Sequence, residues 1–502
     1  MIRRVLIANR GEIARRVMRT CRLMGIATVA VYSDADRHAL HVREADAAVR
    51  IGPAPAPESY LNVPAILDAA RVSGADAVHP GYGFLSENAD FARACVEAGL
   101  TWIGPSADAI RLLGSKTAAR ALAVDAGVPV VRGRRPDDQS DSALEAAVAA
   151  IGVPALIKAV AGGGGKGMRI VRSHADVRDA VAGARREAVH AFGDGELYVE
   201  RLIEHAHHVE VQVLADHHGH VLHLFERDCS LQRRHQKVIE EAPATSVAES
   251  TRAALRQAAV ALCARANYTN AGTVEFLVEG AGTGAERFYF LEMNTRLQVE
   301  HPVTEAITGL DLVELQLRVA AGHPLPLAQA DVRADGHAIE CRLYAEDSRR
   351  LLPQSGRLLR YREPALDGIR VDTGVAEGQS VGVHYDPLLA KVIAHAPTRA
   401  MALDRLRAAL SAFEVLGVHT NATFLRHVLV SPDVEAGRAD TRFIDDHLAV
   451  WSAAPEPSLA RIAAALAAHV GWPATAVGSH TPGEPASANM FDPWSRLGRV
   501  RW

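Results

Sequence analysis

The chain has 502 residues, of which 48% are apolar and 23% are charged, and its formal net charge is −4. This length predicts about three domains, and the weak negative charge argues against non-specific nucleic-acid binding. No uninterrupted apolar run approaches the roughly 18 residues that a membrane helix needs. The N-terminus also lacks a signal-peptide cleavage site. We therefore expect neither a nucleic-acid partner nor a membrane association.

The cysteine and lysine contents are both informative. The five cysteines lie far apart without a Cys-x-x-Cys pair, which favours a reducing, cytoplasmic environment over a disulfide framework or a zinc cluster. Arginine outnumbers lysine by 50 to five, and the lysines are Lys116, Lys158, Lys166, Lys237 and Lys391. In such a background lysine persists mainly where a compact point charge is needed. About three of the five are expected to be functional, the others being chance survivors.

Residues 1 to about 114 alternate between strand and helix patterns. Strands are predicted at residues 4–8, 28–32 and 75–79, and helices at 12–24 and 65–72. This alternation is typical of a parallel sheet that is covered by helices on both faces. Residues 80–88 form a Gly-rich turn after a strand end, where ligands of open α/β sheets bind, although a simple tight turn would look the same.

A second Gly-rich stretch follows a predicted strand that carries Lys158. Lys116 opens an Ala-rich helix, residues 153–160 form the strand, and Ala161-Gly-Gly-Gly-Gly-Lys-Gly-Met168 comes next. Successive backbone N–H groups in such a loop can hold phosphate oxygens. The stretch is not a Walker A loop, because Lys166 is followed by Gly167 and strands flank it. The alternative is a flexible hinge.

Polar residues are concentrated between residues 205 and 237. Residues 207–214 alternate as a strand, so His208, Glu210 and Gln212 share one face. The neighbouring histidines lack thiolate partners or zinc-ligand spacing and are interpreted as solvated turns. Residues 226–237 are either a solvated charged loop or a set of donors for an anionic substrate that includes Lys237.

The strand-like runs at residues 273–278 and 288–291 predict a hairpin around the Gly-rich loop 280–286. A hairpin centred between Thr283 and Gly284 sets Glu275 opposite Glu292, with Asn294 on the same face. Two such carboxylates repel unless a cation lies between them, and oxygen ligands suit Mg²⁺ or Mn²⁺. The alternative is a slipped register with one carboxylate in solvent.

A further α+β segment is expected from about residue 331 to residue 448. It begins with a strand at residues 337–344, in which Arg342 is costly unless it is paired, and it includes a helix at about residues 399–413. Ser458 is predicted to cap a last helix, and residues 474–490 resemble a linker.

Five motifs together resemble the biotin carboxylase family of ATP-grasp enzymes over about residues 1–448: Ile7-Ala-Asn-Arg-Gly-Glu-Ile-Ala14, His79-Pro-Gly-Tyr-Gly-Phe-Leu-Ser-Glu-Asn88, the run from Glu226 to Lys237, Glu292-Met-Asn-Thr-Arg-Leu-Gln-Val-Glu-His-Pro302 and Glu340-Cys-Arg342. The resemblance implies an α/β and α+β fold. Its parts would be a doubly wound N-terminal domain (1–114), an ATP-grasp domain (115–330) with a mobile lid (about 131–203), a C-terminal α+β domain (331–448), and a helical extension and linker (449–502).

The resemblance also implies a reaction, the ATP- and bicarbonate-dependent carboxylation of biotin through carboxyphosphate. This is the first half-reaction of an acetyl-, propionyl- or other acyl-CoA carboxylase. The implied cofactors are ATP, Mg²⁺ or Mn²⁺, and biotin on a carrier domain outside this chain. Water must be excluded from such a site, which suits a closing lid.

Site residues are implied by the same motifs. Lys116 and Lys158 would bind phosphates under a lid loop that includes Gly163, Gly164 and Gly165. The nucleotide would also contact Glu200, Ile203, the Arg201 backbone, His208, Gln232 and His235. Glu275, Glu292 and Asn294 would bind the metal, and Arg296, Gln298 and the Val299 backbone would bind bicarbonate. Glu300 would be the general base, Lys237 would hold carboxyphosphate, and Arg342 would stabilise the biotin enolate.

The implied partners are a biotin carboxyl carrier domain or protein and a carboxyltransferase (β) subunit, in a homodimer or a larger α/β assembly. No Met-Lys-Met biotinylation motif appears and no lysine follows Lys391, so the biotin-bearing lysine is expected outside this sequence. Ala161 and Arg201 stand where the family often has Gly and Lys. Two alternatives remain: another ATP-grasp ligase that activates a carboxylate as an acylphosphate, and a nucleotide-binding scaffold without turnover.

Overall fold

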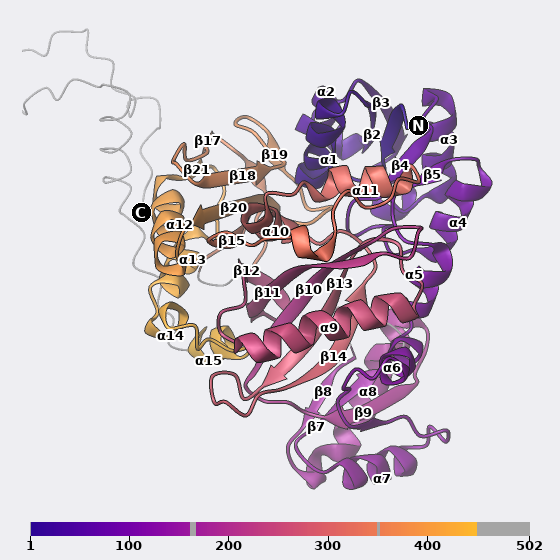
Figure 1. Cartoon of the computed structure of the whole chain (residues 1–502), viewed down its shortest axis with the longest axis vertical. Helices are drawn as coiled ribbons and strands as arrows, with labels where there is room; N and C mark the ends of the chain where they lie inside the picture. The colour runs from indigo at the N-terminus through magenta and orange to yellow at the C-terminus, as the bar shows by residue number, and fades with distance from the viewer. Residues whose placement is uncertain (1, 161–166, 349–351, 449–502) are drawn as a thin grey trace, which may run out of the picture. The chain divides into compact units, whose positions relative to one another are not determined.

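Five parallel strands form the N-terminal sheet in the computed structural model, which describes residues 2–160, 167–348 and 352–448 (Figure 1). The strands are β1 (Arg4–Ile7), β2 (Ala27–Ser33), β3 (Ala47–Gly52), β4 (Ala77–His79) and β5 (Thr101–Trp102), in the order β3-β2-β1-β4-β5. Val5 and Ile7 pack in one apolar core and Leu6 in another, since alternate side chains of a strand point to opposite faces. The predicted doubly wound parallel sheet is confirmed.

Helices connect these strands and lead into the next part of the chain. They are α1 (Gly11–Leu23), α2 (Leu40–Glu44), α3 (Val63–Ser73), α4 (Ala89–Glu97), α5 (Ala107–Gly114) and α6 (Lys116–Asp125). Ser115 caps α6 by accepting a hydrogen bond from the N–H of Ala118. Lys116 therefore lies in the first turn of an Ala-rich helix, as predicted.

An eight-stranded sheet in the order β14-β13-β10-β11-β12-β15-β20-β18 carries most of the predicted site. Its strands are β10 (Ala206–Ala215), β11 (Val221–Arg233), β12 (Gln236–Ala242), β13 (Asn270–Glu279), β14 (Arg287–Asn294), β15 (His337–Tyr344), β18 (Ile369–Thr373) and β20 (Leu388–Ala396). The pairing of β12 with β15 is antiparallel. It joins strands on both sides of the predicted boundary near residue 330, so one sheet runs across that boundary.

The hairpin of β13 and β14 has the predicted loop, residues 280–286, between its strands. Glu275 pairs with Glu292 and Thr273 with Asn294, which confirms the predicted register at the polar end of the hairpin. A β-bulge lies between Glu275 and Phe276, so Phe276 pairs with Phe290, one residue away from the prediction. A bulge adds one residue to one strand, so the register on the loop side differs by one residue from the register at the polar end.

Residues 226–233 and 236–237 belong to β11 and β12. Of the two alternatives for this run, the solvated charged loop is therefore wrong. The end of β11 and the start of β12 pair through Gln232 with Lys237 and Arg233 with Gln236. The turn consists of Arg234 and His235, which have positive φ angles of 49° and 65°. Most of the β11 side chains before this turn are buried.

A four-stranded sheet in the order β6-β9-β7-β8 lies within the predicted lid region. Its strands are β6 (Gly133–Arg134), β7 (Ala155–Ala159), β8 (Arg169–Val171) and β9 (Leu197–Arg201). Helices α7 (Asp141–Ile151) and α8 (Val177–Phe192) pack on it around an apolar core that includes Leu144, Ile157 and Val181 (Figure 1). The predicted Gly163, Gly164, Gly165 and Lys166 lie outside the described residues, as does the predicted extension at 449–502.

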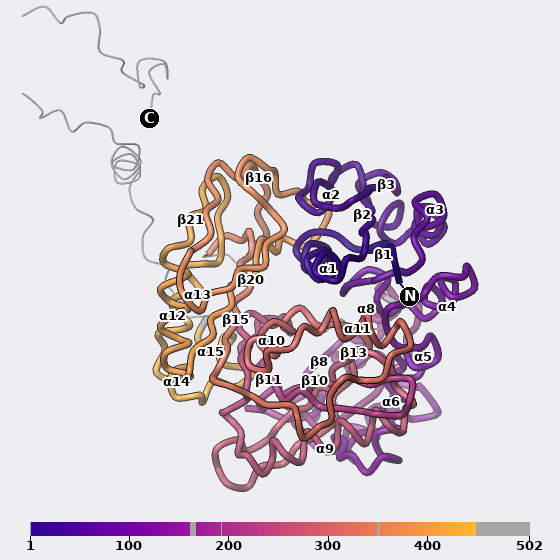
Figure 2. Tube along the Cα trace, turned by 45° about the horizontal axis from the view of Figure 1, so that its top comes forward, coloured from indigo at the N-terminus to yellow at the C-terminus, as the bar shows by residue number. Residues whose placement is uncertain are grey.

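The two faces of the eight-stranded sheet differ in polarity. Apolar residues of β10 (Val209, Val211 and Val213) pack with Leu255 and Leu262 of α9 (Glu249–Arg265) in one core. The alternate residues of β10 (His208, Glu210 and Gln212) point to the other face. Helix α10 (His301–Thr308) packs there against β11, β12 and β15, and Figure 2 shows α9 and α10 on opposite sides of the sheet.

The C-terminal strands are covered by further helices. They are α12 (Arg399–Ala412), α13 (Ala422–Leu429), α14 (Pro432–Glu435) and α15 (Phe443–Leu448), while α11 (Leu312–Ala320) packs in the core beneath β1. Two small sheets pair β16 (Gly356–Arg357) with β19 (Ser380–Val381) and β17 (Arg360–Arg362) with β21 (Glu414–Leu416). No helix in the described part of the chain is long and apolar enough to cross a membrane.

Candidate active site

Lys237 is the centre of a buried charge network on the polar face of the eight-stranded sheet. Its Nζ atom donates hydrogen bonds to Glu210 at 2.5 Å, to Glu275 at 2.7 Å and to Glu300 at 2.7 Å. These carboxylates come from β10, from β13 and from the residue before α10. Hydrogen bonds between charged groups are shorter and stronger than neutral ones, so Lys237 ties three separate segments together.

The protonation states of this network follow from its charges. Burial lowers the pKa of Lys237, but the three carboxylates outweigh it and hold that pKa well above its ordinary value. Burial alone would raise the pKa of Glu300, whereas Lys237, Arg342 and Arg227 together hold it well below its ordinary value. Glu300 is therefore ionised and can accept a proton from a substrate placed beside it.

Arg342 contacts Glu300 from β15. One of its Nη atoms lies 3.0 Å from Glu300, and its Nε donates to Glu240 at 2.6 Å. Burial and the nearby Glu300 raise the pKa of Glu240 to about 7, against the opposing effect of Arg342. The sequence predicts that an arginine within this strand is unfavourable unless it is paired, and Glu240 and Glu300 provide that pairing.

Arg227 lies beneath this network with no exposed surface. Its guanidinium donates to Glu210 at 2.5 Å and to Gln212 at 2.8 Å, and it also reaches the hydroxyls of Thr273 and Thr304. A fully paired arginine fork of this kind fixes the positions of its partners. Arg227 therefore holds Glu210 in place for Lys237.

The predicted metal ligands lie together at the polar end of the β13–β14 hairpin. Glu275 and Glu292 are cross-strand partners, and the Asn294 side chain donates to Glu275 at 2.8 Å. Partial loss of hydration among its neighbours and the opposed Glu275 carboxylate raise the pKa of Glu292, although the residue is exposed. Two carboxylates and an amide oxygen are the ligands that Mg²⁺ or Mn²⁺ takes, and a cation would relieve their repulsion. The residues present therefore fit such an ion.

A second group of possible ligands consists of His208, Glu210 and Glu275. His208 Nε2 lies 3.1 Å from Glu275. Burial lowers the pKa of His208, but Glu275 outweighs this effect and raises it. Because Lys237 already neutralises Glu210 and Glu275 here, this group is interpreted as part of the charge network.

The predicted bicarbonate ligands follow directly on β14. Arg296 donates to Gln298 at 2.9 Å and to Asn294 at 3.0 Å, while its Nε lies 2.9 Å from Glu87. Gln298 in turn donates to Glu275 at 3.1 Å. The structure thus brings Arg296, Gln298 and the metal ligands together, and it adds Glu87, which the sequence had not marked as a site residue.

The predicted phosphate ligands Lys116 and Lys158 lie close to each other. Lys158 Nζ is 2.6 Å from Glu200, and Lys116 Nζ is 3.5 Å from the carbonyl of Ala159. Burial and the neighbouring Lys158 lower the pKa of Lys116, and Glu292 acts against them. Two adjacent ammonium groups favour a polyanion such as the phosphate chain of a nucleotide.

The predicted adenine contacts surround a small apolar cluster. Ile203 is buried with Val131 and Ala206, and Leu277 and Tyr289 pack against them. The Arg201 side chain pairs with Glu279 at 2.8 Å, and its backbone N–H donates to the carbonyl of Arg132. An apolar surface of this kind suits a flat base.

The predicted ribose and phosphate contacts at residues 232 and 235 lie at the turn between β11 and β12, where Gln232 is the cross-strand partner of Lys237. Gln232 is at the end of β11, and His235 is exposed in the turn that follows it. No hydrogen bond joins either side chain to the network in the described residues. Their roles stay predictions.

Sequence reasoning missed Glu87, Glu210, Arg227 and Glu240 as members of the site. Glu210 carried a signal, because the alternation in residues 207–214 places it on the same face as His208. Glu87 lies in the Gly-rich turn motif that ends at Asn88. Arg227 and Glu240 carried no signal in the sequence beyond their place in polar runs, because their roles depend on which strands pair.

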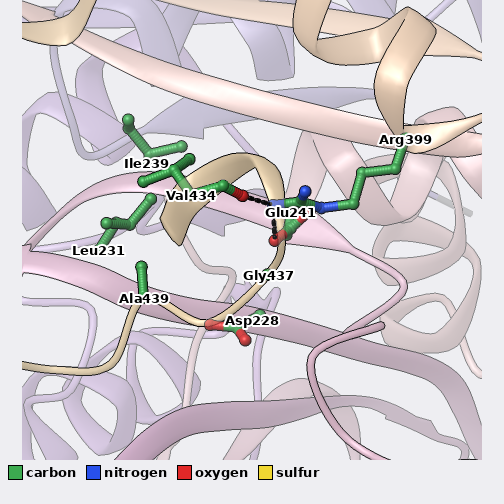
Figure 3. Close-up of a pocket in the computed structure, with 8 residues that line it drawn as sticks. All are labelled: Asp228, Leu231, Ile239, Glu241, Arg399, Val434, Gly437 and Ala439. Atoms are coloured by element: carbon green, nitrogen blue, oxygen red, sulfur yellow. Dashed lines mark hydrogen bonds and ion pairs between the residues drawn. The ribbon is translucent and has the colours of Figure 1, made fainter. Parts of the chain in front are cut away.

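A small cavity lies outside this site, between β11, β12 and the segment from α14 to residue 439 (Figure 3). Its volume is about 20 Å³, and its lining includes Asp228, Glu241 and Arg399. Arg399 points to Glu241 at 2.7 Å and donates to the carbonyl of Val434 at 2.8 Å. Such a volume holds about one water molecule, which excludes a nucleotide.

Comparisons with known proteins agree with this geometry. Three family models match: "Biotin carboxylase, N-terminal domain" over residues 1–110, "Carbamoyl-phosphate synthase L chain, ATP binding domain" over 115–328, and "Biotin carboxylase C-terminal domain" over 340–446. The biotin carboxylase of Campylobacter jejuni, described as a beta-gamma-ATP complex, is 43% identical with a TM-score of 0.86, and the match covers 89% of this chain and 99% of that one.

Curated relatives cover most of this chain too. A biotin carboxylase of Halalkalibacterium halodurans is 51% identical over 456 residues, which is 90% of this chain and 99% of that protein. The mitochondrial methylcrotonoyl-CoA carboxylase subunit alpha of Arabidopsis thaliana is 52% identical over 448 residues, 89% of this chain and 61% of that protein. The chain thus spans about three fifths of such alpha subunits but nearly the whole of a separate biotin carboxylase. It belongs to the biotin carboxylase family.

Proposed function

We propose that the protein carboxylates biotin with ATP and bicarbonate through carboxyphosphate, as a C–N ligase. The observation that carries this proposal is the shared contact of Lys237 and Arg342 with the ionised Glu300. One base and two cations thus lie next to one another, which suits a reaction in which a small oxyanion loses a proton. The family relationship supports the same chemistry.

Each residue has a defined part in this proposal. Arg296, Gln298 and the Val299 backbone hold bicarbonate while Glu300 takes its proton. Lys237 offsets the charge that develops on carboxyphosphate, and Arg342 offers guanidinium N–H groups to the ureido oxygen of biotin. Glu275, Glu292 and Asn294 would hold a divalent cation, which would supply neutralisation of the phosphate charge.

The nucleotide would be held mostly by residues outside this charge network, with His208 as the member that belongs to it. Lys116, Lys158 and the lid glycines 163–165 are assigned to its phosphates, and Glu200, Arg201 and Ile203 to its adenine. His208, Gln232 and His235 complete the set. The proximity of Lys116 to Lys158 and the apolar cluster around Ile203 support this assignment.

Phosphate release from ATP tests the proposal. The wild-type chain should release phosphate at a rate that depends on both bicarbonate and free biotin. Glu300→Gln should lower this rate by at least about 100-fold, because the general base is lost, while ATP still binds by calorimetry. Glu97→Gln, on the exposed surface of α4, is the matched control and should retain full activity. Equal phosphate release without bicarbonate would contradict the proposal.

A second ATP-grasp activity, the activation of another carboxylate as an acylphosphate, is separated from the first by Arg342. Arg342→Ala should abolish the dependence on biotin and leave ATP binding within about threefold, because Arg342 contacts Glu240 and Glu300 and none of the predicted ATP ligands. If Arg342→Ala weakened ATP binding as much as it lowered biotin-dependent turnover, the acylphosphate-forming activity would be favoured instead.

We propose that the domains are residues 1–114, 115–330 with a lid at about 131–203, and 331–448, followed by a helical extension and linker at 449–502. Matches of the three family models to residues 1–110, 115–328 and 340–446 support the first three. All five cysteines are buried and unpaired, which supports a reducing compartment such as the cytoplasm.

The proposed partners are a biotin carboxyl carrier and a carboxyltransferase (β) subunit, in a homodimer or a larger assembly. Relatives named as propionyl-CoA and methylcrotonoyl-CoA carboxylase alpha chains support this, and one similar structure is described as a biotin carboxylase domain dimer. Mass spectrometry of the copurified complex should show which chain carries biotin. Recovery of this chain alone and without bound partners would contradict the assembly.

A further inference from the structure

Lys391 is a completely buried lysine to which the proposed reaction gives no role. It lies within β20 opposite Arg342 of β15 and Asp372 of β18. Cross-strand partners share one face of a sheet, so Lys391 lies on the same face as Arg342. A buried ammonium group is costly unless it is paired, so its contacts indicate why it is retained.

The shortest contact of Lys391 is to the backbone of the predicted bicarbonate segment. Its Nζ donates to the carbonyl oxygen of Val299 at 2.7 Å, whereas it lies 3.2 Å from Glu12 and 4.0 Å from Asp372. The Val299 carbonyl belongs to the peptide group that also contains the N–H of Glu300. Because a peptide group is planar and rigid, a bond to its oxygen fixes the start of the Glu300 backbone.

The preceding peptide group is held independently. The carbonyl oxygen of Gln298 contacts Nδ1 of His301 at 2.7 Å. Both carbonyls that precede Glu300 are thus bound by side chains, one from α10 and one from β20. The backbone between the predicted bicarbonate ligands and the proposed base therefore has little freedom to rotate.

Glu12 connects the same lysine to the N-terminal sheet. The Tyr82 hydroxyl donates to the Glu12 carboxylate that Lys391 contacts, which links two of the sequence motifs to the Glu300 segment. Glu340, on the same face of β15, has no hydrogen-bond partner for either carboxylate oxygen among the described residues. Burial raises its pKa well above the ordinary value, and Lys391 acts against this effect.

We propose that Lys391 is a positioning residue, which holds the Val299–Glu300 peptide so that the Val299 backbone and the Glu300 carboxylate keep their geometry towards bicarbonate. This inference rests on the proposed function. It assigns the lysine to bicarbonate and proton transfer and not to ATP. A purely structural lysine would affect both substrates alike.

Steady-state kinetics of the full chain with free biotin tests the proposal. Lys391→Met should lower kcat/KM for bicarbonate by about 10- to 100-fold, the usual effect of losing one charge-assisted hydrogen bond, and leave KM for ATP within about twofold. Glu12→Gln is the matched control, because it removes the ion pair and leaves the bond to Val299. It should lower the melting temperature and leave kcat/KM for bicarbonate within about threefold.

Two results would overturn the proposal. One is a Lys391→Met protein whose KM for ATP changes as much as its kcat/KM for bicarbonate. The other is a Glu12→Gln protein whose kcat/KM for bicarbonate falls by about 10-fold or more. If Lys391→Met does not fold, Glu12→Gln decides alone, since a bicarbonate defect there would assign the role to the contact with the N-terminal sheet. Absence of bicarbonate-dependent turnover in the wild-type chain would instead refute the proposed function itself.

Discussion

Glu275 and Glu292 lie directly opposite each other on β13 and β14. Like charges at such a position repel, typically by a few tenths of a kcal/mol to about 1 kcal/mol. Lys237, His208 and Asn294 all contact Glu275, whereas Glu292 shares none of these contacts. The pair is therefore asymmetric, with one carboxylate neutralised by the protein and the other available to a cation.

Replacement of Glu292 should separate stability from metal binding. Partial loss of hydration and the opposed Glu275 raise the pKa of Glu292, so its charged form disfavours the folded state. Glu292→Gln should therefore raise the melting temperature in EDTA, by an amount corresponding to about 0.5–1 kcal/mol. It should also abolish most of the stabilisation that Mg²⁺ gives the wild type together with ATP. Thermal unfolding in EDTA and in Mg²⁺ measures both effects.

The control for this prediction is Glu97→Gln, which removes one carboxylate from an exposed helix surface. It should leave the melting temperature in EDTA and the Mg²⁺ effect unchanged. A Glu292→Gln protein that still responds fully to Mg²⁺ would show that Glu292 is not a metal ligand.

Glu87 is expected to orient Arg296 for bicarbonate. Its carboxylate accepts hydrogen bonds from the Arg296 side chain at 2.9 Å and from the N–H of Thr295 at 3.1 Å. Glu87→Gln weakens the charged contact, so KM for bicarbonate should rise by about 10-fold. Initial rates at varied bicarbonate measure this. An unchanged KM would mean that Gln298 and Asn294 orient Arg296 without Glu87.

The local sequence pattern correctly predicted those strands and hairpins that depend on one continuous stretch of the chain. The hairpin and its loop at residues 280–286 followed from two strand-like runs around a Gly-rich segment, and the strand at residues 337–344 followed from its composition. The β-bulge beside Glu275 was not predictable, because one extra residue in a strand leaves no compositional mark. The pairs beside the loop are shifted by one residue from the prediction, and the bulge offsets this shift, so Glu275 and Glu292 are opposed as predicted.

The order of strands in the large sheet could not be read from the chain. Lys237 meets Glu210 and Glu275 because β10 lies between β13 and β11, and Arg342 meets Glu240 because β12 pairs with β15. These are contacts between distant segments, which no local periodicity encodes. For the same reason the sequence left a solvated loop open as one alternative for residues 226–237, since the partners that bury their charges are remote in sequence.

The buried Arg227 gives a prediction about stability. Arg227→Met should destabilise the fold strongly, by about 3–5 kcal/mol, because Glu210 would lose a partner in a site without solvent. The double variant Arg227→Met with Glu210→Gln should recover part of this loss, since a neutral amide tolerates burial better. Thermal unfolding of the single and double variants measures the coupling. Additive effects of the two substitutions would show that the pair does not act as a unit.

The ion pair of His207 and Asp228, beside the small cavity of Figure 3, should make stability depend on pH. Burial lowers the pKa of His207, but Asp228 outweighs it and raises that pKa above its ordinary 6.5. Burial raises the pKa of Asp228, whereas His207 and two serine hydroxyls lower it to about 2. Both groups are thus charged in the folded protein at weakly acidic pH.

The sign of the pH effect follows from His207, which binds its proton more tightly in the folded than in the unfolded state. Its contribution is complete below about pH 6.5 and is lost as the pH rises through the folded pKa. His207→Gln should therefore cost stability at about pH 5.5, on the order of 1–2 kcal/mol, and less at about pH 8.5. Melting temperatures at the two pH values measure this, with the exposed His323 replaced by Gln as the control. An equal cost at both pH values would show that His207 is neutral in the folded protein and contributes only through packing.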